Sequence, residues 1–193
     1  MTQRWVRGPG LAWIGAERFC SLGAGWVAAL GCLAVGALGA IGCARPAAAA
    51  NLDDIRQLEA LINAAGVVTL VSDHCPPRHA GYYDQDGRGG HQLVLCRHGV
   101  NLADGEAVWE VMAHEATHIM QACTGSGAIA DDQMPRTFSE LRSIAPHYAK
   151  LIDRSYPSSD QRIEAEAFWM ELQPPQAVIS LFRRLCSAGL RNR

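Results

Sequence analysis

The chain has 193 residues, of which 49% are apolar and 19% are charged. This composition supports a packed core and excludes wholesale disorder, and a formal net charge of −2 gives no electrostatic basis for nucleic-acid binding. Residues 51–193 hold 13 Lys and Arg, 18 Asp and Glu and all seven histidines. We therefore expect a mildly acidic domain of ordinary size over 51–193, preceded by a separate N-terminal segment over 1–50.

The first fifty residues have the features of an export signal. Three arginines precede an uncharged run over 19–44, and small residues follow over 47–50. We expect cleavage after Ala49 or Ala50, so that the mature protein is secreted or periplasmic. Two alternatives stay open, an uncleaved membrane anchor and lipidation at Cys43. Under each of these three predictions, only the N-terminal segment contacts a membrane.

The domain is expected to begin with a helix followed by a small sheet. Asn51 or Asp53 can cap a helix that runs to about Ala65, with apolar residues at helical spacing, and Gly66 ends it. A β-rich run follows at 67–71. The segments 81–84 and 92–96 flank a glycine-rich turn and predict a hairpin.

The rest of the chain is expected to be helical. Asp104 can cap a helix over 106–123 that Gly125 ends. Further helices are predicted at 136–152, 160–172 and 175–188, separated by proline-containing breaks. The order of one helix, a few strands and then helices throughout predicts an α+β fold.

The cysteine content agrees with export. Four cysteines follow the signal, and an even number in an oxidising compartment favours pairing. Three connectivities are possible, and four buried free thiols are the alternative. Cys75 and Cys96 flank the hairpin, Cys123 ends the 106–123 helix and Cys186 lies in the last helix. We therefore hypothesise the pairs Cys75–Cys96 and Cys123–Cys186.

The motif His114-Glu115-Ala116-Thr117-His118 has the form H-E-x-x-H on a predicted helix. Two histidines four residues apart lie on one helix face, so both imidazoles can bind one zinc ion. Zinc lowers the pKa of a bound water to about 7, and the Glu115 carboxylate can take its proton as general base. The opposite face of this helix is almost wholly apolar, which predicts a core side and a cleft side with the histidines toward the cleft.

A catalytic zinc has three protein ligands and an open fourth position. The candidates for the third ligand are Glu164 and Glu166, on the predicted helix 160–172. Being two residues apart, they point about 200° away from each other, so only one can easily face the metal. The hydrophobic periodicity of the helix does not choose between them.

With these residues the chain resembles a minimal zincin metallopeptidase of the gluzincin type, over about residues 52–172. In that type a helix and a small sheet precede the H-E-x-x-H helix, and a glutamate from a later helix, often in an E-x-x-A pattern, completes the site. The resemblance implies Glu164 as third ligand, because Ala167 then takes the small position that Trp169 would take for Glu166. This chain departs from the pattern at Phe168, where an acidic or amide residue often follows the alanine.

These observations together predict an exported zinc peptidase acting on a peptide or protein substrate. His114, His118 and Glu164 would hold the metal, and Glu115 would act as general base and then as acid toward the leaving amine. His147 or Tyr148 is a weaker candidate for donating a hydrogen bond to the oxyanion, as a histidine or tyrosine does in such enzymes. The alternatives are a zinc-binding domain without hydrolytic activity and a metal-free binding domain held by disulfides.

Overall fold

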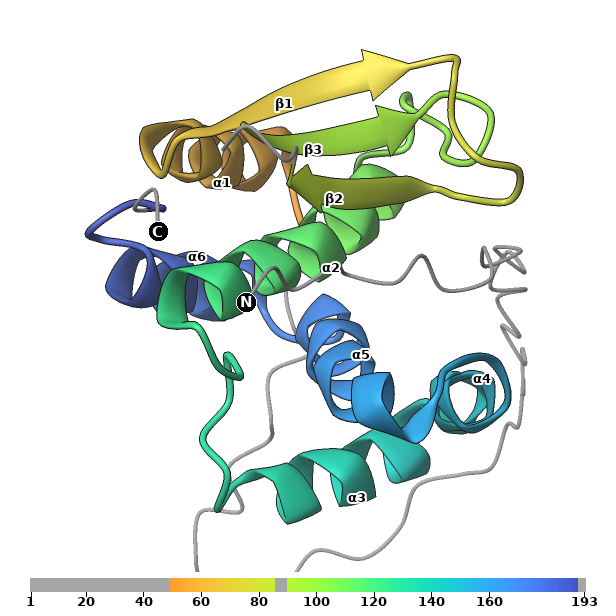
Figure 1. Ribbon diagram of the computed structural model, residues 1–193. Helices are drawn as coiled ribbons and strands as arrows, with labels where there is room; N and C mark the ends of the chain where they lie inside the picture. The colour runs from red at the N-terminus through yellow and green to blue at the C-terminus, as the bar shows by residue number, and fades with distance from the viewer. Residues whose placement is uncertain (1–48, 86–89, 191–193) are drawn as a thin grey trace, which may run out of the picture. The chain divides into compact units, whose positions relative to one another are not determined.

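The computed structural model describes residues 49–85 and 90–190 (Figure 1). Residues 1–48, which include Cys43 and all but the last two residues of the predicted signal or anchor, lie outside this range. Among the described residues, no helix is both long enough and apolar enough to cross a membrane.

A capped helix leads into a three-stranded sheet. Helix α1 (Leu52–Ala64) begins at Asn51, whose side chain accepts hydrogen bonds from the backbone N–H groups of Asp53 and Asp54, and Gly66 follows it with φ +91°. The sheet has the order β1-β3-β2, with β1 parallel to β3 and β2 antiparallel to it. The strands are β1 (Val67–Ser72), β2 (Gly81–Gln85) and β3 (His91–Cys96). The hairpin prediction is confirmed, and β1 and β2 are the two edges.

Helix α2 (Gly105–Thr124) carries the H-E-x-x-H motif through the middle of the fold. Asp104 caps its first turn through the N–H groups of Glu106 and Ala107, and Gly125 ends it in the left-handed conformation at φ +71°. Figure 1 shows α2 between the sheet and α5. The predicted apolar face is buried as expected, but the histidine face is largely covered too, because α5 and β2 pack over it.

Four more helices complete the described part of the chain: α3 (Met134–Ile144), α4 (Pro146–Ser155), α5 (Ser158–Glu171) and α6 (Pro175–Leu185). The single helix predicted over 136–152 is wrong, since α3 ends at Ile144 and α4 begins at Pro146. The physical reason is Pro146, which disfavours helical dihedrals at Ala145, where φ is −140° and ψ is 65°, and suits a first helical position. The α+β fold class is confirmed.

The core has two parts. The larger hydrophobic cluster joins α1, the inner face of the sheet, α2 and α6, and the smaller one joins α3, α4 and α5. Trp169 packs against both clusters, and α2 and α5 meet between them. The histidine motif therefore lies where the two clusters join.

Two disulfides link distant parts of the domain. Cys75 pairs with Cys96 and Cys123 with Cys186, at Cα–Cα distances of 5.7 and 5.4 Å. The hypothesised connectivity is thus confirmed. The first bond ties the segment after β1 to the end of β3, and the second ties the last turn of α2 to the end of α6.

We expect the two disulfides to differ in their effect on stability. In the chain-entropy model, losing Cys123–Cys186, which closes 63 residues, should lower the free energy of unfolding by about 4 kcal/mol, and losing Cys75–Cys96, which closes 21, by about 3 kcal/mol. Urea denaturation of the two paired Cys→Ser variants measures both values. A larger loss for the Cys75/Cys96 variant would contradict this ranking.

Gly81 sets how closely β2 approaches α2. A Cβ atom at this position would lie 2.5 Å from Val111 Cγ1 and 2.9 Å from the carbonyl oxygen of Val94. The second atom belongs to the backbone of β3 and cannot rotate away. Only glycine therefore lets β2 lie this close to the helix that bears the histidines.

Gly81→Ala should consequently destabilise the domain by about 1–3 kcal/mol, the usual range for forcing extra volume into a packed site. The matched control is Gly105→Ala, whose Cβ would meet only Ile55 Cδ1 at 3.8 Å, an ordinary contact. Chemical denaturation of both variants compares them. Equal stabilities would show that β2 is free to move away from α2.

Candidate metal centre

The three predicted ligand residues lie together in the fold. His114 and His118 stand on one face of α2 with ring centroids 5.0 Å apart, and Glu164 faces them from α5. Glu164 Oε2 lies 3.5 Å from His114 Nε2, and Glu164 Oε1 lies 3.8 Å from His118 Nε2. One ligand atom from each residue falls within 4.8 Å of the other two.

The distances between these nitrogen and oxygen atoms fit a small cation bound between them better than direct hydrogen bonds. Tetrahedral zinc with ligand distances of about 2.1 Å separates its ligand atoms by about 3.4 Å, close to the separations here. Glu164 Oε2 is buried and has no hydrogen-bond partner among the described residues. An unsatisfied buried carboxylate oxygen is costly, and a cation between it and the two imidazoles would satisfy it.

Each histidine also makes a hydrogen bond through Nδ1, the ring nitrogen that does not face Glu164. His114 Nδ1 lies 2.6 Å from Glu171 Oε1, and His118 Nδ1 lies 2.9 Å from Gln121 Oε1. Both oxygens accept, so in the neutral rings Nδ1 carries the proton and Nε2 presents its lone pair toward Glu164. Metal-binding histidines characteristically have such partners.

Sequence reasoning missed Glu171. It lies seven residues after Glu164, which is two turns along the same face of α5, and this spacing was the available signal. The departure at Phe168 is also explained, because the Phe168 ring packs edge-on against His114 with centroids 4.8 Å apart. The acidic partner of His114 is therefore supplied one turn later than the resemblance implies.

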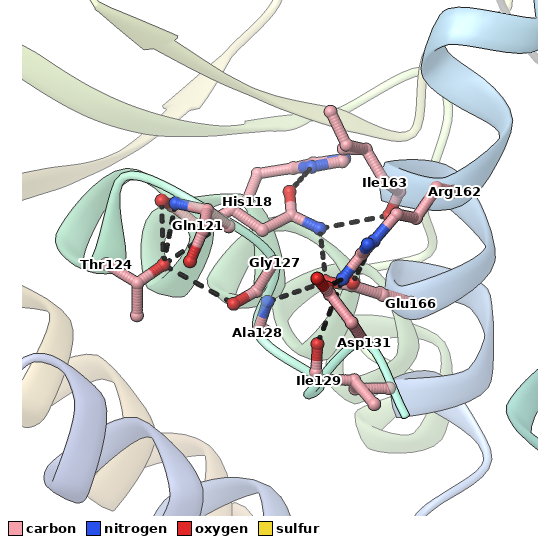
Figure 2. A network of polar contacts seen from close by, with 11 residues as sticks. His118, Gln121, Thr124, Gly127, Ala128, Ile129, Asp131, Arg162, Ile163 and Glu166 are labelled. Carbon is pink, nitrogen blue, oxygen red and sulfur yellow. Dashed lines mark hydrogen bonds and ion pairs between the residues drawn. The ribbon is translucent and has the colours of Figure 1, made fainter. Parts of the chain in front are cut away.

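Glu166, the rival candidate for third ligand, points elsewhere. Its side chain is fully buried and accepts hydrogen bonds from the backbone N–H of Ala128 at 2.6 Å and from Gln121 Nε2 at 3.1 Å. Its other oxygen pairs with Arg162 Nε at 3.3 Å. Figure 2 shows these contacts between α5 and the segment that follows α2. Of the two glutamates, Glu164 is the one beside the histidines.

Glu115 is buried next to the histidines and close to β2. The backbone N–H of Tyr83 faces its carboxylate, and a Cβ at Gly81 would come within 3.7 Å of Glu115 Cγ. Burial raises the pKa of the Glu115 carboxyl above its usual range, with His114 and His118 partly opposing the shift. A pKa raised toward neutrality suits a group that first accepts and then gives up a proton.

The other charged groups of the site support one another. Burial alone would raise the pKa of Glu164, but His114 and His118 hold it below its usual range. Burial alone would lower the pKa of His114, but Glu164 and Glu171 raise it well above its usual value. The imidazole and the carboxylates thus each stabilise the charged form of the other.

The residues expected to donate to the oxyanion were His147 or Tyr148, and the structure places a second tyrosine, Tyr156, near the site as well. His147 is exposed, and its ring lies tilted against that of Tyr148. The Tyr148 ring packs on Phe168, and its hydroxyl interacts with Glu171. Sequence reasoning missed Tyr156, which directly follows α4 and whose hydroxyl interacts with Glu164. Burial, together with the nearby carboxylates, raises the pKa of both phenols, so each stays a neutral donor.

Comparison with known proteins gives a family without an assigned activity. Residues 87–187 match the family described as Domain of unknown function (DUF8637), which is just over half of the chain. The chain belongs to this family. No curated protein and no solved structure matches it. The matched range contains α2, α5 and all the residues of the candidate centre.

Glu171→Leu should weaken zinc binding by about 10–100-fold, the usual effect of removing the partner behind a metal-binding histidine. Zinc competition with a chromogenic chelator gives the dissociation constants. Glu140→Gln is the control, because Glu140 lies on α3 and pairs with Arg136 and Trp169 instead of the histidines. If both variants bound zinc as tightly as the original protein, Glu171 would have no part in holding His114.

Proposed function

We propose that this protein is an exported zinc-dependent peptidase. The observation that carries the proposal is the convergence of His114 and His118 from α2 with Glu164 from α5, and the burial of Glu115 next to the histidines. The resemblance to gluzincin-type zincins points to the same chemistry. Export rests on the composition of the N-terminal segment.

The donor set favours zinc in a catalytic role. Two imidazole nitrogens and one carboxylate oxygen are a usual catalytic zinc set, whereas structural sites are closed by four protein ligands. Among the described residues, the group has three members. In catalytic zinc sites with three protein ligands, water or substrate takes the fourth position.

The roles of the surrounding residues follow from their placement. Bound zinc would supply a Lewis acid that polarises a peptide carbonyl and makes water more acidic. The Glu115 carboxylate takes a proton from the attacking water and passes it to the departing amine nitrogen. The neutral hydroxyl of Tyr156 interacts with Glu164, and by turning from this carboxylate it would donate its hydrogen bond to the developing oxyanion.

The edge strand β2 supports a peptide as substrate. β2 pairs with β3 on one side, and its other side is a sheet edge. An extended peptide can add to such an edge through main-chain hydrogen bonds. Because the N–H of Tyr83 and the close approach at Gly81 both place this edge beside Glu115, a peptide lying along β2 passes the general base.

Two glutamate variants separate binding from catalysis. Glu115→Gln should keep zinc but lower peptide hydrolysis by about 10²–10⁴-fold, since it removes the general base and leaves the ligands intact. Glu164→Gln should weaken zinc binding by at least about tenfold, because two imidazoles alone hold zinc poorly. Zinc content and hydrolysis of a fluorogenic peptide library are measured for both variants.

The outcomes also distinguish the alternatives. Stoichiometric zinc with no hydrolysis by the unsubstituted protein would favour a zinc-binding domain without activity. Absence of zinc affinity in the unsubstituted protein would favour a disulfide-held binding domain. Undiminished hydrolysis by Glu115→Gln would contradict the mechanism.

A further inference from the structure

We infer that Gln121 and Glu166 are positioning residues, which together hold His118 in the Nδ1–H tautomer and so place its lone pair on Nε2, the atom that faces Glu164. The inference rests on the proposed function for the identity of the metal. Its structural basis is a chain of polar contacts behind His118, drawn in Figure 2.

The orientation of the Gln121 amide is fixed by two acceptors. Gln121 Nε2 lies 3.0 Å from the carbonyl oxygen of Ile163 and 3.1 Å from Glu166 Oε2. A carbonyl and a carboxylate only accept hydrogen bonds, so they occupy both N–H groups of the amide. The Gln121 Oε1 atom is thereby directed at His118 Nδ1, 2.9 Å away.

This orientation determines which ring nitrogen of neutral His118 carries the proton. Gln121 Oε1 is an acceptor, so the hydrogen bond forms only when Nδ1 carries a proton. The neutral ring then has its lone pair on Nε2, the atom that faces Glu164. A reversed amide would favour the proton on Nε2 and remove the lone pair that a metal needs.

Glu166 holds the amide because all its polar neighbours donate. The backbone N–H of Ala128 and the Gln121 amide both reach Oε2, while Arg162 Nε reaches Oε1. A protonated carboxyl or an amide at this position would direct a hydrogen-bond donor at one of these donor groups. The carboxylate is therefore the group that this buried position fits, which gives Glu166 a role distinct from that of a ligand.

The same carboxylate ties the segment after α2 to α5. Arg162, besides pairing with Glu166, donates to the carbonyl oxygen of Ile129 and pairs with Asp131 at 2.5 Å. A Cβ at Gly127 would collide with Glu166 Oε1 and with Arg162 Nη2, so this segment needs glycine to pass over the carboxylate. The position of the Gln121 amide is thus fixed from both elements.

The test begins with the full-length, metal-free protein labelled with ¹⁵N-histidine. Long-range ¹H–¹⁵N couplings identify the tautomer of the neutral His118 ring, and we expect Nδ1–H. Gln121→Leu, which keeps the bulk but removes the acceptor, should shift the ring toward Nε2–H and raise the zinc dissociation constant about 10–100-fold. The control is Asp73→Ala, because the exposed Asp73 pairs with Arg97 and neither residue takes part in the contacts behind His118; it should leave both readouts unchanged.

The outcomes separate this inference from the proposed function. An Nε2–H tautomer in the unsubstituted protein would overturn the inference, and this measurement needs no variant to fold. A zinc dissociation constant for Gln121→Leu within twofold of that of Asp73→Ala would overturn it as well, while leaving zinc binding intact. An Nδ1–H tautomer that is lost in Gln121→Leu would support the inference even if the unsubstituted protein bound no zinc, and the proposed function alone would then fail.

Discussion

The packing of α5 across the histidine face of α2 is the constraint on which the candidate centre depends. This contact brings three carboxylates of one helix into the interior, where they face different neighbours. Glu164 and Glu171 lie two turns apart on one face and meet the histidines, whereas Glu166 points to the other side and meets donors of the segment after α2. Because burying a charge without partners is costly, these partners also fix the rotation of α5 about its own axis.

The rest of the fold holds the two helices in place. α2 belongs to the larger hydrophobic cluster, whereas α5 contributes Ala165 and Phe168 to the smaller one and Met170 to the larger one, so the ligand distances depend on how the two clusters meet. Trp169 packs into both, and the Cys123–Cys186 bond anchors the end of α2 to α6. At the sheet side, the close approach at Gly81 sets the position of β2 relative to Glu115. A site formed between two clusters can thus be as well defined as one inside a single core.

Features with local causes could be predicted from the sequence. The caps at Asn51 and Asp104 and the histidine pair four residues apart depend on neighbours in the chain, and the structure has them as expected. The break at Ala145 was also local but was overlooked, because the apolar spacing continues past Pro146. Spacing along one element does not reveal contacts with distant parts of the chain. The contacts of Glu171, Gln121 and Tyr156 are of this kind, and so is the parallel pairing of β1 with β3.

The two histidines are supported by different chemical groups, and the burial of the site explains why. His114 makes its Nδ1 hydrogen bond to the carboxylate of Glu171, which raises the basicity of the ring as a metal ligand but buries one negative charge. A second carboxylate in place of Gln121 would stand beside fully buried Glu166, and two like charges at that distance repel strongly in a poorly solvated interior. The amide avoids this repulsion, because it accepts from His118 on one side and donates to Glu166 on the other. His118 is thereby oriented by a buried charge that it does not touch, and the candidate centre itself carries one fewer carboxylate.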